Sequence, residues 1–498
     1  MIDPPSRPRR PAIAACLSFL FPGLGQAYLG ERRLALLLAV PVLVLLLAAV
    51  LAITIGGTAA LNSAFSAGFL TALVALDLAL MAWRLFAIGE AGFKAPESER
   101  ATVPVTVGGP SPAERQPMTP GRIGTIAVVV LLMLLTVGMH AWAAMVIGRV
   151  NTTLGDVFSG VGGGPPGGQG GNPPPLNRPE YAWNGTERIN FLLLGIDSAP
   201  RRGDEALTDT ILVVSVDPES KKAVMISIPR DTGFLPLPDR SVYADGLYPN
   251  KINELTTEAG ANPELWCPDL STDQGAACGL RTLERTVGLY LGLPIQYYAT
   301  IDLFGFQHLI DAVGPLTLCL PGKLVDDTYH EPGDAFGPRR GVELPAGCTE
   351  YDGPHALAYA RARKGYMEMP DGTQIQLDDF KRADRQQEVL LELRRHFAEM
   401  DLFFDLPDAL EAIGATVKTD FPRDKAGDLA SLLPLITGTD IRRLVLDVPR
   451  FVDPPPDPLA NYILVPRRDD LRVAMRRLFG RENLEGWYLT TRDPGPDT

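Results

Sequence analysis

Three long apolar runs lie before residue 150, and they constrain the fold of this chain more than any other feature. They cover residues 34–55, 65–88 and 123–147, are each about 22 to 25 residues long, and the first carries no charge. A helix of this length spans the hydrocarbon core of a bilayer. The sequence therefore predicts three membrane-spanning helices and makes the lipid bilayer an expected partner.

A fourth apolar segment, residues 12–29, is shorter and is interrupted by Pro22, Gly23 and Gly25. These residues weaken a continuous lipid-facing helix, so a short or re-entrant helix is predicted. A basic start before an apolar stretch is also typical of a secretory signal peptide. Against that alternative, the charged residues 31–33 and a further apolar run follow in place of a small-residue cleavage pattern.

Basic residues at the ends of these segments set the predicted orientation. All of them can be cytoplasmic only if the first segment does not cross the membrane. Three crossings then place the C-terminal part outside, as a multi-pass membrane protein with an extracytoplasmic domain. The basic residues concerned are Arg7, Arg9, Arg10, Arg32, Arg33, Lys94, Arg100, Arg115 and Arg122.

Two stretches of biased composition separate the apolar runs from the rest of the chain. The first is rich in Pro, Ser and charge, and the second is dominated by Gly and Pro, which bury no core. The predicted organisation is an N-terminal membrane region (1–93), a cytoplasmic linker (94–121), a membrane helix (122–148), an extracytoplasmic tether (149–187) and one folded domain (188–498).

The folded domain alternates between strand and helix patterns. Short apolar runs interleaved with helical periodicity predict a layered α/β/α domain with a covered, mixed central sheet. The predicted strands are residues 189–195, 211–216, 223–229 and 443–449, and the predicted helices are 279–291, 303–313, 379–400 and 469–479.

Charge and cysteine content narrow the function classes. The net charge is −13, from 46 basic and 59 acidic residues, which argues against a nucleic-acid binder with a broad basic face. Cys16 lies in the apolar region, and the other four cysteines lie in the exported domain, where two disulfides are permitted. We expect them to pair across two loops, Cys267 with Cys278 and Cys319 with Cys348.

Acidic residues stand at the predicted strand ends. Asp197 follows the first strand, Asp209 opens the second, and Arg230 and Asp231 close the third. Groups at the carboxyl ends of strands converge on one crevice, whereas Asp209 precedes its strand and needs a loop that folds back. Two adjacent carboxylates repel without a cation, and Mg²⁺ suits such ligands, with Mn²⁺ as an alternative. Taken singly, these residues also fit turns, caps or a structural ion pair.

Arginine residues cluster farther along the chain. Arg361 and Arg363 are two positions apart, which places both guanidiniums on one side of an extended segment. Arg382, Arg385 and Gln386 share one face at the start of a predicted helix. Guanidiniums aimed at one spot repel without an anion, and their planar forks match phosphate oxygens. The pattern favours a phosphate site, although a solvated helix face is the ordinary alternative for each residue alone.

Six ordered blocks resemble the LytR-CpsA-Psr family of bacterial cell-envelope proteins. The resemblance covers residues 188 to about 479 and excludes the membrane region. Between residues 363 and 379 the chain is longer than is usual in the family, and this segment is expected to form part of the acceptor site or a lid. The blocks are NFLLLGID (190–197), TDT (208–210), SIPRD (227–231), KIN (251–253), ALAYARAR (356–363) and DFKR with RQQ (379–382 and 385–387).

This resemblance implies an activity. Members of the family transfer a glycan 1-phosphate from a polyprenyl-pyrophosphate carrier to a cell-wall hydroxyl, typically on peptidoglycan. We therefore expect a Mg²⁺-dependent phosphotransferase of the bacterial cytoplasmic membrane, with pyrophosphatase activity when water attacks. The family also implies an apolar tunnel that holds the prenyl chain.

The same resemblance assigns residues to roles, position by position. It implies metal binding by Asp197 and Asp209, and it places Asp379 in the pyrophosphate site. Asp231 or Asp379 would accept the proton of the acceptor hydroxyl, and the sequence does not choose between them. The catalytic candidates are thus Arg230, Asp231 and Asp379, and the implied pyrophosphate ligands are Arg230, Arg361, Arg363, Arg382 and Gln386.

Two functions from other classes compete with transfer. A non-catalytic envelope receptor or regulator would bind the same lipid carrier through the arginine cluster without turnover. A phosphohydrolase of soluble substrates would gain little from a membrane tether. The scattered histidines argue against a His-based metal site or a Ser-His-Asp triad; they are His308, His330, His355 and His396.

Overall fold

The structure is a computed structural model that divides into two compact units, Met1–Asn151 and Thr152–Thr498. Residues 95–119 of the predicted linker and residues 160–182 of the predicted tether lie outside the described part of the chain. The residues that the structure describes are 10–94, 120–159, 183, 185–197, 207–331, 341–399, 412–414, 416–432, 441–455 and 462–480.

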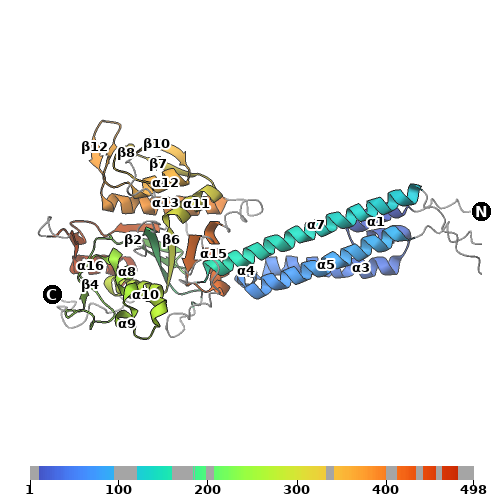
Figure 1. The fold of residues 1–498 in the computed structure, drawn as a ribbon, viewed down its shortest axis with the longest axis horizontal. Coiled ribbons are helices and arrows are strands. Elements are labelled where there is room, and N and C mark those ends of the chain that lie inside the picture. Colours follow the sequence, from blue (N-terminus) through green and yellow to red (C-terminus); the bar gives the residue numbers. More distant parts are fainter. Residues whose placement is uncertain are drawn as a thin grey trace, which may run out of the picture. The chain divides into compact units, whose positions relative to one another are not determined.

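The N-terminal unit is helical (Figure 1). Three of its helices are long and apolar enough to cross a membrane, and they correspond to the three predicted spans. A short helix between the first two spans was not predicted. The described helices are α1 (Pro11–Leu20), α2 (Leu24–Leu29), α3 (Arg32–Ile55), α4 (Gly57–Phe65), α5 (Ala67–Phe93) and α7 (Pro120–Val157).

The interrupted segment at the N-terminus forms two short helices, α1 and α2, where one was predicted. Pro22 lacks a donor for helix continuation, and Gly23 has a positive φ of 100°, which favours glycine. At ten residues, α1 is about 15 Å long, which is too short to span a bilayer core. At the other end of the unit, α7 continues through residues 149–157, which the sequence assigned to the tether.

The C-terminal unit is built on a six-stranded mixed sheet with the order β13-β6-β1-β2-β3-β14. β1 runs parallel to β6, and β3 runs parallel to β14. The β1–β2, β2–β3 and β6–β13 pairs are antiparallel. These strands are β1 (Ile189–Asp197), β2 (Leu207–Asp217), β3 (Lys222–Ser227), β6 (Tyr297–Asp302), β13 (Val417–Thr419) and β14 (Ile441–Val445).

Helices cover both faces of this sheet, as Figure 1 shows, which confirms the predicted three-layer α/β/α fold. Alternate residues of β1 serve the two layers, because successive side chains of a strand point to opposite faces. Leu192 and Leu194 pack in a core with α10, while Leu193 faces α11 and α13. One layer holds α8 (Leu255–Ala261), α9 (Pro263–Trp266), α10 (Gly275–Leu291) and α16 (Arg468–Phe479); the other holds α11 (Leu303–Val313), α12 (Gly353–Arg361) and α13 (Asp379–Glu399).

Smaller sheets and turns complete the unit. The long segment between residues 363 and 379 forms the β11–β12 hairpin of a four-stranded sheet with the order β12-β11-β8-β9. The remaining elements are β4 (Leu235–Pro236), β5 (Leu247–Tyr248), β7 (Leu316–Leu320), β8 (Lys323–Asp326), β9 (Val342–Leu344), β10 (Gly347–Tyr351), β11 (Tyr366–Glu368), β12 (Gln374–Gln376), α15 (Ala426–Leu432), β15 (Val452–Asp453) and β16 (Val465–Pro466).

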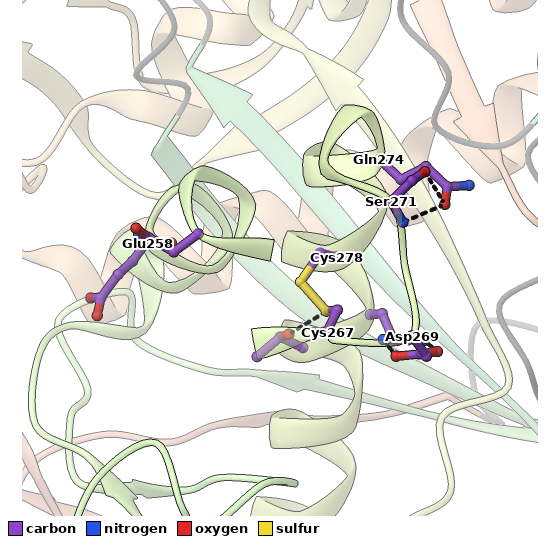
Figure 2. The surroundings of a disulfide bond; sticks show 9 residues. Glu258, Cys267, Asp269, Ser271, Gln274 and Cys278 are labelled. Carbon is purple, nitrogen blue, oxygen red and sulfur yellow. Dashed lines mark hydrogen bonds and ion pairs between the residues drawn. A yellow bond between two sulfur atoms is a disulfide. The ribbon is translucent and has the colours of Figure 1, made fainter. Parts of the chain in front are cut away.

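Both expected disulfides are present in the structure. Cys319 and Cys348 are directly opposite in the antiparallel β7–β10 pair, so the pairing of the strands brings them together. Cys267, at the end of α9, bonds to Cys278 in α10 (Figure 2). Between the two cysteines, Ser271 and Gln274 form a capping box at the start of the short helical turn that precedes α10. Cys16 carries an exposed free thiol.

Candidate functional site

The two carboxylates implied as metal ligands lie on neighbouring antiparallel strands. Asp197 is the last residue of β1, and Asp209 is the third residue of β2, which begins beside the end of β1. The register shifts here, and Asp209 is left as a bulge residue between the pairs made by Thr208 and Thr210. The expectation that Asp209 precedes its strand was wrong, because β2 begins at Leu207, while the expected reversal of the chain agrees with the antiparallel pairing.

Arg230 follows β3 at the same edge, because β1 and β3 are both antiparallel to β2. Its Nη1 donates to Asp209 Oδ1 at 2.7 Å, and its Nε lies 3.9 Å from Asp231 Oδ2. Lys251 Nζ lies 3.0 Å from the other oxygen of Asp231. Burial lowers the pKa of Arg230, but attraction to Asp209, Asp379 and Asp231 outweighs it and raises the pKa above its ordinary value. Arg230 therefore stays charged.

Two further arginines come from the end of α12. The predicted extended conformation around Arg361 and Arg363 was wrong for Arg361, which is the last residue of α12; Arg363 lies beyond the helix. The helix is started by Asp352, whose side chain accepts from the backbone of His355, and by a proline in the first turn. Arg361 Nη2 lies 3.8 Å from Asp197 Oδ2. The α12 C-terminus thus extends the cluster to β1.

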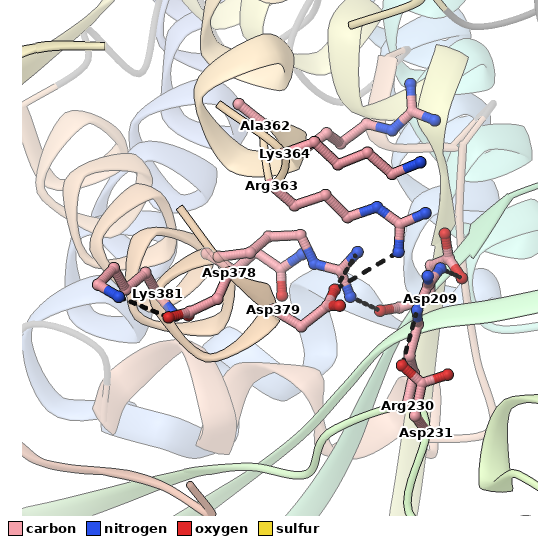
Figure 3. A network of polar contacts seen from close by, with 12 residues as sticks. Asp209, Arg230, Asp231, Ala362, Arg363, Lys364, Asp378, Asp379 and Lys381 are labelled. Atoms are coloured by element: carbon pink, nitrogen blue, oxygen red, sulfur yellow. Dashed lines mark hydrogen bonds and ion pairs between the residues drawn. The ribbon is translucent and has the colours of Figure 1, made fainter. Parts of the chain in front are cut away.

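The first turn of α13 completes the cluster. Asp379 Oδ1 lies 3.0 Å from Arg382 Nη1 and 3.6 Å from Arg363 Nη1, and Arg382 Nη2 donates to the Asp209 carbonyl at 3.2 Å. Figure 3 shows the Arg363 guanidinium pointing toward Asp379, and Arg230 between Asp209 and Asp231. The pKa of Arg382 is lowered, chiefly by burial, with Asp379 opposing the shift.

Several guanidinium atoms of this cluster are buried without a hydrogen-bond partner. They are Arg230 Nε, Arg361 Nη1 and Arg382 Nε, which come from the turn after β3, from α12 and from α13. A buried donor normally finds an acceptor, because leaving it unsatisfied costs about 1 to 3 kcal/mol. Three such donors around one spot match an anion with several oxygens, such as a diphosphate. The cluster gathers Asp197, Asp209, Arg230, Asp231, Arg361, Arg363, Asp379 and Arg382.

Sequence reasoning missed one supporting carboxylate and misjudged one arginine. Asp326, 2% exposed at the end of β8, accepts from the backbone N–H groups of Arg363 and Lys364 at 3.0 and 3.1 Å. No motif marks it, since its partners are 37 and 38 residues away. Arg385 is buried and donates to carbonyls of α12 at Tyr359 and after its end, so it braces α12 and does not join the anion cluster.

An apolar cavity of about 240 Å³ opens beside this cluster, between the sheet and the layer of α11, α12 and α13. Leu193 and Leu212 line it from the sheet, and Leu393 lines it from α13. Arg361 of the cluster and Gln386 are among its polar lining residues, and Gln386 donates to the Ala360 carbonyl at 3.3 Å. Apolar walls next to an anion site fit a ligand with a lipid part and a charged part.

The carboxylates of the cluster are also candidate ligands for a metal ion. Among the described residues, no group of three or more His, Cys, Asp or Glu side chains is placed to hold one. Asp197 and Asp209 supply two carboxylates at one edge. Mg²⁺ is commonly held by one or two carboxylates, with waters and substrate phosphates filling the other positions. The residues present fit such an ion when a phosphorylated substrate is bound.

Comparison with known proteins identifies the family. The model of the LytR_cpsA_psr family matches residues 173–452, which is more than half of the chain. The chain belongs to the LytR_cpsA_psr family. The match covers β1 to β14 and every residue of the site cluster, which agrees with the six blocks read from the sequence.

The relatives described next are named as a transferase and as a regulatory protein. The polyisoprenyl-teichoic acid–peptidoglycan teichoic acid transferase TagU of Oceanobacillus iheyensis is 30% identical over 239 residues, 48% of this chain and 61% of that protein. The regulatory protein MsrR of Staphylococcus aureus is 30% identical over 237 residues, 47% of this chain and 57% of that protein. The chain thus spans less than two thirds of the length of either relative. A crystal structure of Bacillus subtilis TagV aligns with 59% of this chain and 96% of its own, at 23% identity and a TM-score of 0.44.

Proposed function

We propose that this protein is a phosphotransferase that moves a glycan 1-phosphate from a polyprenyl-pyrophosphate carrier to a peptidoglycan hydroxyl. The observation that carries the proposal is the position of the arginine–aspartate cluster beside an apolar cavity. The cluster suits a diphosphate, and the cavity suits the first part of a prenyl chain. The membership of the family and a relative named as a transferase support the same activity.

The reaction follows from charge and position. An acceptor hydroxyl attacks the phosphorus that carries the glycan, the bond from that phosphorus to the bridging oxygen breaks, and polyprenyl phosphate leaves. Arg230, Arg361 and Arg382 would hold the diphosphate oxygens and neutralise the charge that develops on the leaving group. Arg363, which lies 3.6 Å from Asp379, would contribute further positive charge to the same oxygens. When water replaces the acceptor, the same step is pyrophosphate hydrolysis.

The hydroxyl proton passes to a carboxylate. Asp231 and Asp379 are the candidates, and both lie in the cluster against cations, Lys251 for Asp231 and Arg382 for Asp379. Mg²⁺ near Asp197 and Asp209 would supply additional positive charge at the diphosphate. Comparing Asp231→Asn with Asp379→Asn identifies the base: the variant of the base should lose more of kcat than of binding of the lipid carrier.

We also propose that α3, α5 and α7 cross the membrane and leave the site outside the cytoplasm. Their length and apolar composition and the position of the basic residues at their ends support this topology. A transferase that uses a lipid carrier and a cell-wall acceptor must meet both at the outer surface of the cytoplasmic membrane.

The test uses the full chain in detergent micelles with a synthetic polyprenyl-diphosphate glycan and Mg²⁺. Release of polyprenyl monophosphate is measured for the native chain and for Arg361→Ala/Arg363→Ala. We expect the double variant to lose about 100-fold or more in rate. Arg395→Ala is the matched control, since this exposed arginine pairs with Glu392 on the same helix as Arg382 but outside the cluster. Full activity of the double variant would refute the assignment.

A regulator remains the second candidate function, favoured by the relative named as a regulatory protein. It would use the same cluster and cavity to bind the lipid carrier without breaking a bond. Binding of the lipid carrier by the native chain, with no monophosphate released over hours at saturating Mg²⁺, would select this function over transfer.

A further inference from the structure

Side chains of α7 contact two glycines of α5 in the membrane unit. An added Cβ at Gly92 of α5 would lie 2.3 Å from Val129 Cγ2 of α7, and one at Gly89 would lie 2.9 Å from Met133 Cε. Small residues at such positions leave room for the side chains of a neighbouring membrane helix. The segment of α7 around Val129 and Met133 therefore packs against the C-terminal part of α5.

Farther along the same two helices lies a pair of ionisable side chains. His140 Nδ1 of α7 and Asp77 Oδ1 of α5 are 2.7 Å apart, and the two side chains are only 10% and 17% exposed. Both residues lie inside the long apolar helices. Asp77 Oδ2 and His140 Nε2 are buried without a hydrogen-bond partner. Ionisable residues at such depth are rare, and they mark functional contacts when they occur.

Among the described residues, no hydrogen bond or ion pair links Asp77 or His140 to a further charged side chain. α4 has no titratable residue, and α3 has none after Arg33. Arg84 of α5 lies seven residues from Asp77, and its guanidinium donates to the Phe19 carbonyl. The other titratable side chains of the described helices around the pair lie near helix ends or on α1, namely Cys16, Tyr28, Arg32, Glu90, Arg122, Arg149 and Asp156.

A buried polar side chain without a partner is costly in hydrocarbon. Asp77 and His140 each supply the hydrogen-bond partner of the other, so removing either one leaves the other unpaired between α5 and α7.

We propose that Asp77 and His140 form a membrane-embedded hydrogen-bonded pair that fastens α7 to α5. Its role is to couple the N-terminal helices to the helix that continues into the C-terminal unit. This role is independent of the transfer activity proposed above. It gives the N-terminal helices a function, which is to fix the anchor helix.

The test separates α5 from α7 after the full chain has folded. A protease site is inserted within residues 95–119, the purified chain is cut in a mild detergent, and the fraction of the N-terminal piece that stays bound to the α7 piece is measured. The variants are Asp77→Leu, His140→Leu, the double leucine variant and the exchange Asp77→His/His140→Asp. Thr71→Leu, on α5 and exposed to lipid, is the control for an added leucine.

We expect each single leucine variant to lower the bound-to-free ratio roughly fivefold to thirtyfold, because it leaves one polar partner unpaired. The double leucine and exchange variants should recover at least half of that loss on a logarithmic scale. Additive losses in the double variant and no recovery in the exchange variant would overturn the pairing.

Discussion

Arg230 joins two strands and two carboxylates in the candidate site. Its Nη1 holds Asp209 at 2.7 Å, and its Nε is buried without an acceptor. Arg230→Ala should lower kcat/KM for polyprenyl-pyrophosphate cleavage about 100-fold or more, because it removes positive charge where negative charge develops. Steady-state kinetics on the full chain test this. Arg230→Lys should recover only a minor part, since an ammonium group cannot bridge both contacts; full recovery would contradict the role of the planar fork.

Asp326 positions the segment after α12 and not the substrate. Its Oδ2 accepts from the backbone N–H groups of Arg363 and Lys364, and its Oδ1 accepts from the Thr328 N–H. Asp326→Asn therefore turns its amide donor toward one of these two sides and breaks the hydrogen bonds there. We expect KM for the lipid carrier to rise about tenfold with a smaller change in kcat, from a loss of about 1 to 2 kcal/mol. Asp327→Asn, at the exposed neighbouring position, is the control. An unchanged KM in Asp326→Asn would show that this contact does not position Arg363.

At the scale of elements, the apolar cavity makes a prediction about chain length. Ala299 of β6 lines the cavity and is only partly buried, so Ala299→Leu fills space without displacing a packed neighbour. Cleavage of a long polyprenyl donor should fall at least tenfold, whereas a donor with one or two isoprene units should be cleaved at the native rate. Equal losses for both donors would contradict a prenyl-binding cavity, and thermal unfolding of the variant checks that the fold is kept.

The disulfides should contribute stability in the order of their loop lengths. The cysteines are 29 residues apart in Cys319–Cys348 and 11 apart in Cys267–Cys278. Loop-closure entropy gives each bond roughly 3 kcal/mol, with the longer loop somewhat larger. Replacing each pair with serine and measuring denaturant unfolding of the full chain tests the order. A larger loss for the Cys267 and Cys278 variant would contradict the entropic account.

The sequence predicted long elements well and short ones poorly. β1 and α13 follow from an apolar run and from helical periodicity over many residues, and both lie where they were expected. Residues 358–363 were interpreted as an extended segment that carries Arg361 and Arg363 on one side, although Asp352 with a following proline is a helix-start signal. The place of Asp209 depended on strand direction, which local pattern does not encode. Asp326 depended on a long-range contact that no motif marks.

At the scale of the whole molecule, the proposed topology places the two ends of the N-terminal unit on opposite sides of the membrane. Alkaline phosphatase, which is active only outside the cytoplasm, should be inactive when fused after residue 94 and active when fused after residue 159. A fourth crossing by α1 and α2 would reverse both results, if the N-terminus stays inside. The fusion series therefore decides whether this interrupted segment crosses.

The central claim is transfer, and its product tests it most directly. The full chain in detergent, with Mg²⁺, a synthetic polyprenyl-diphosphate glycan and a soluble peptidoglycan fragment, is analysed by mass spectrometry of the fragment. Our account predicts a fragment heavier by one glycan phosphate, formed together with an equal amount of polyprenyl monophosphate, and absent when Mg²⁺ is chelated or when Arg361 and Arg363 are both alanine. An unmodified fragment beside free glycan 1-phosphate would show hydrolysis without transfer, and an unmodified fragment beside intact donor would show no catalysis; either result contradicts the claim.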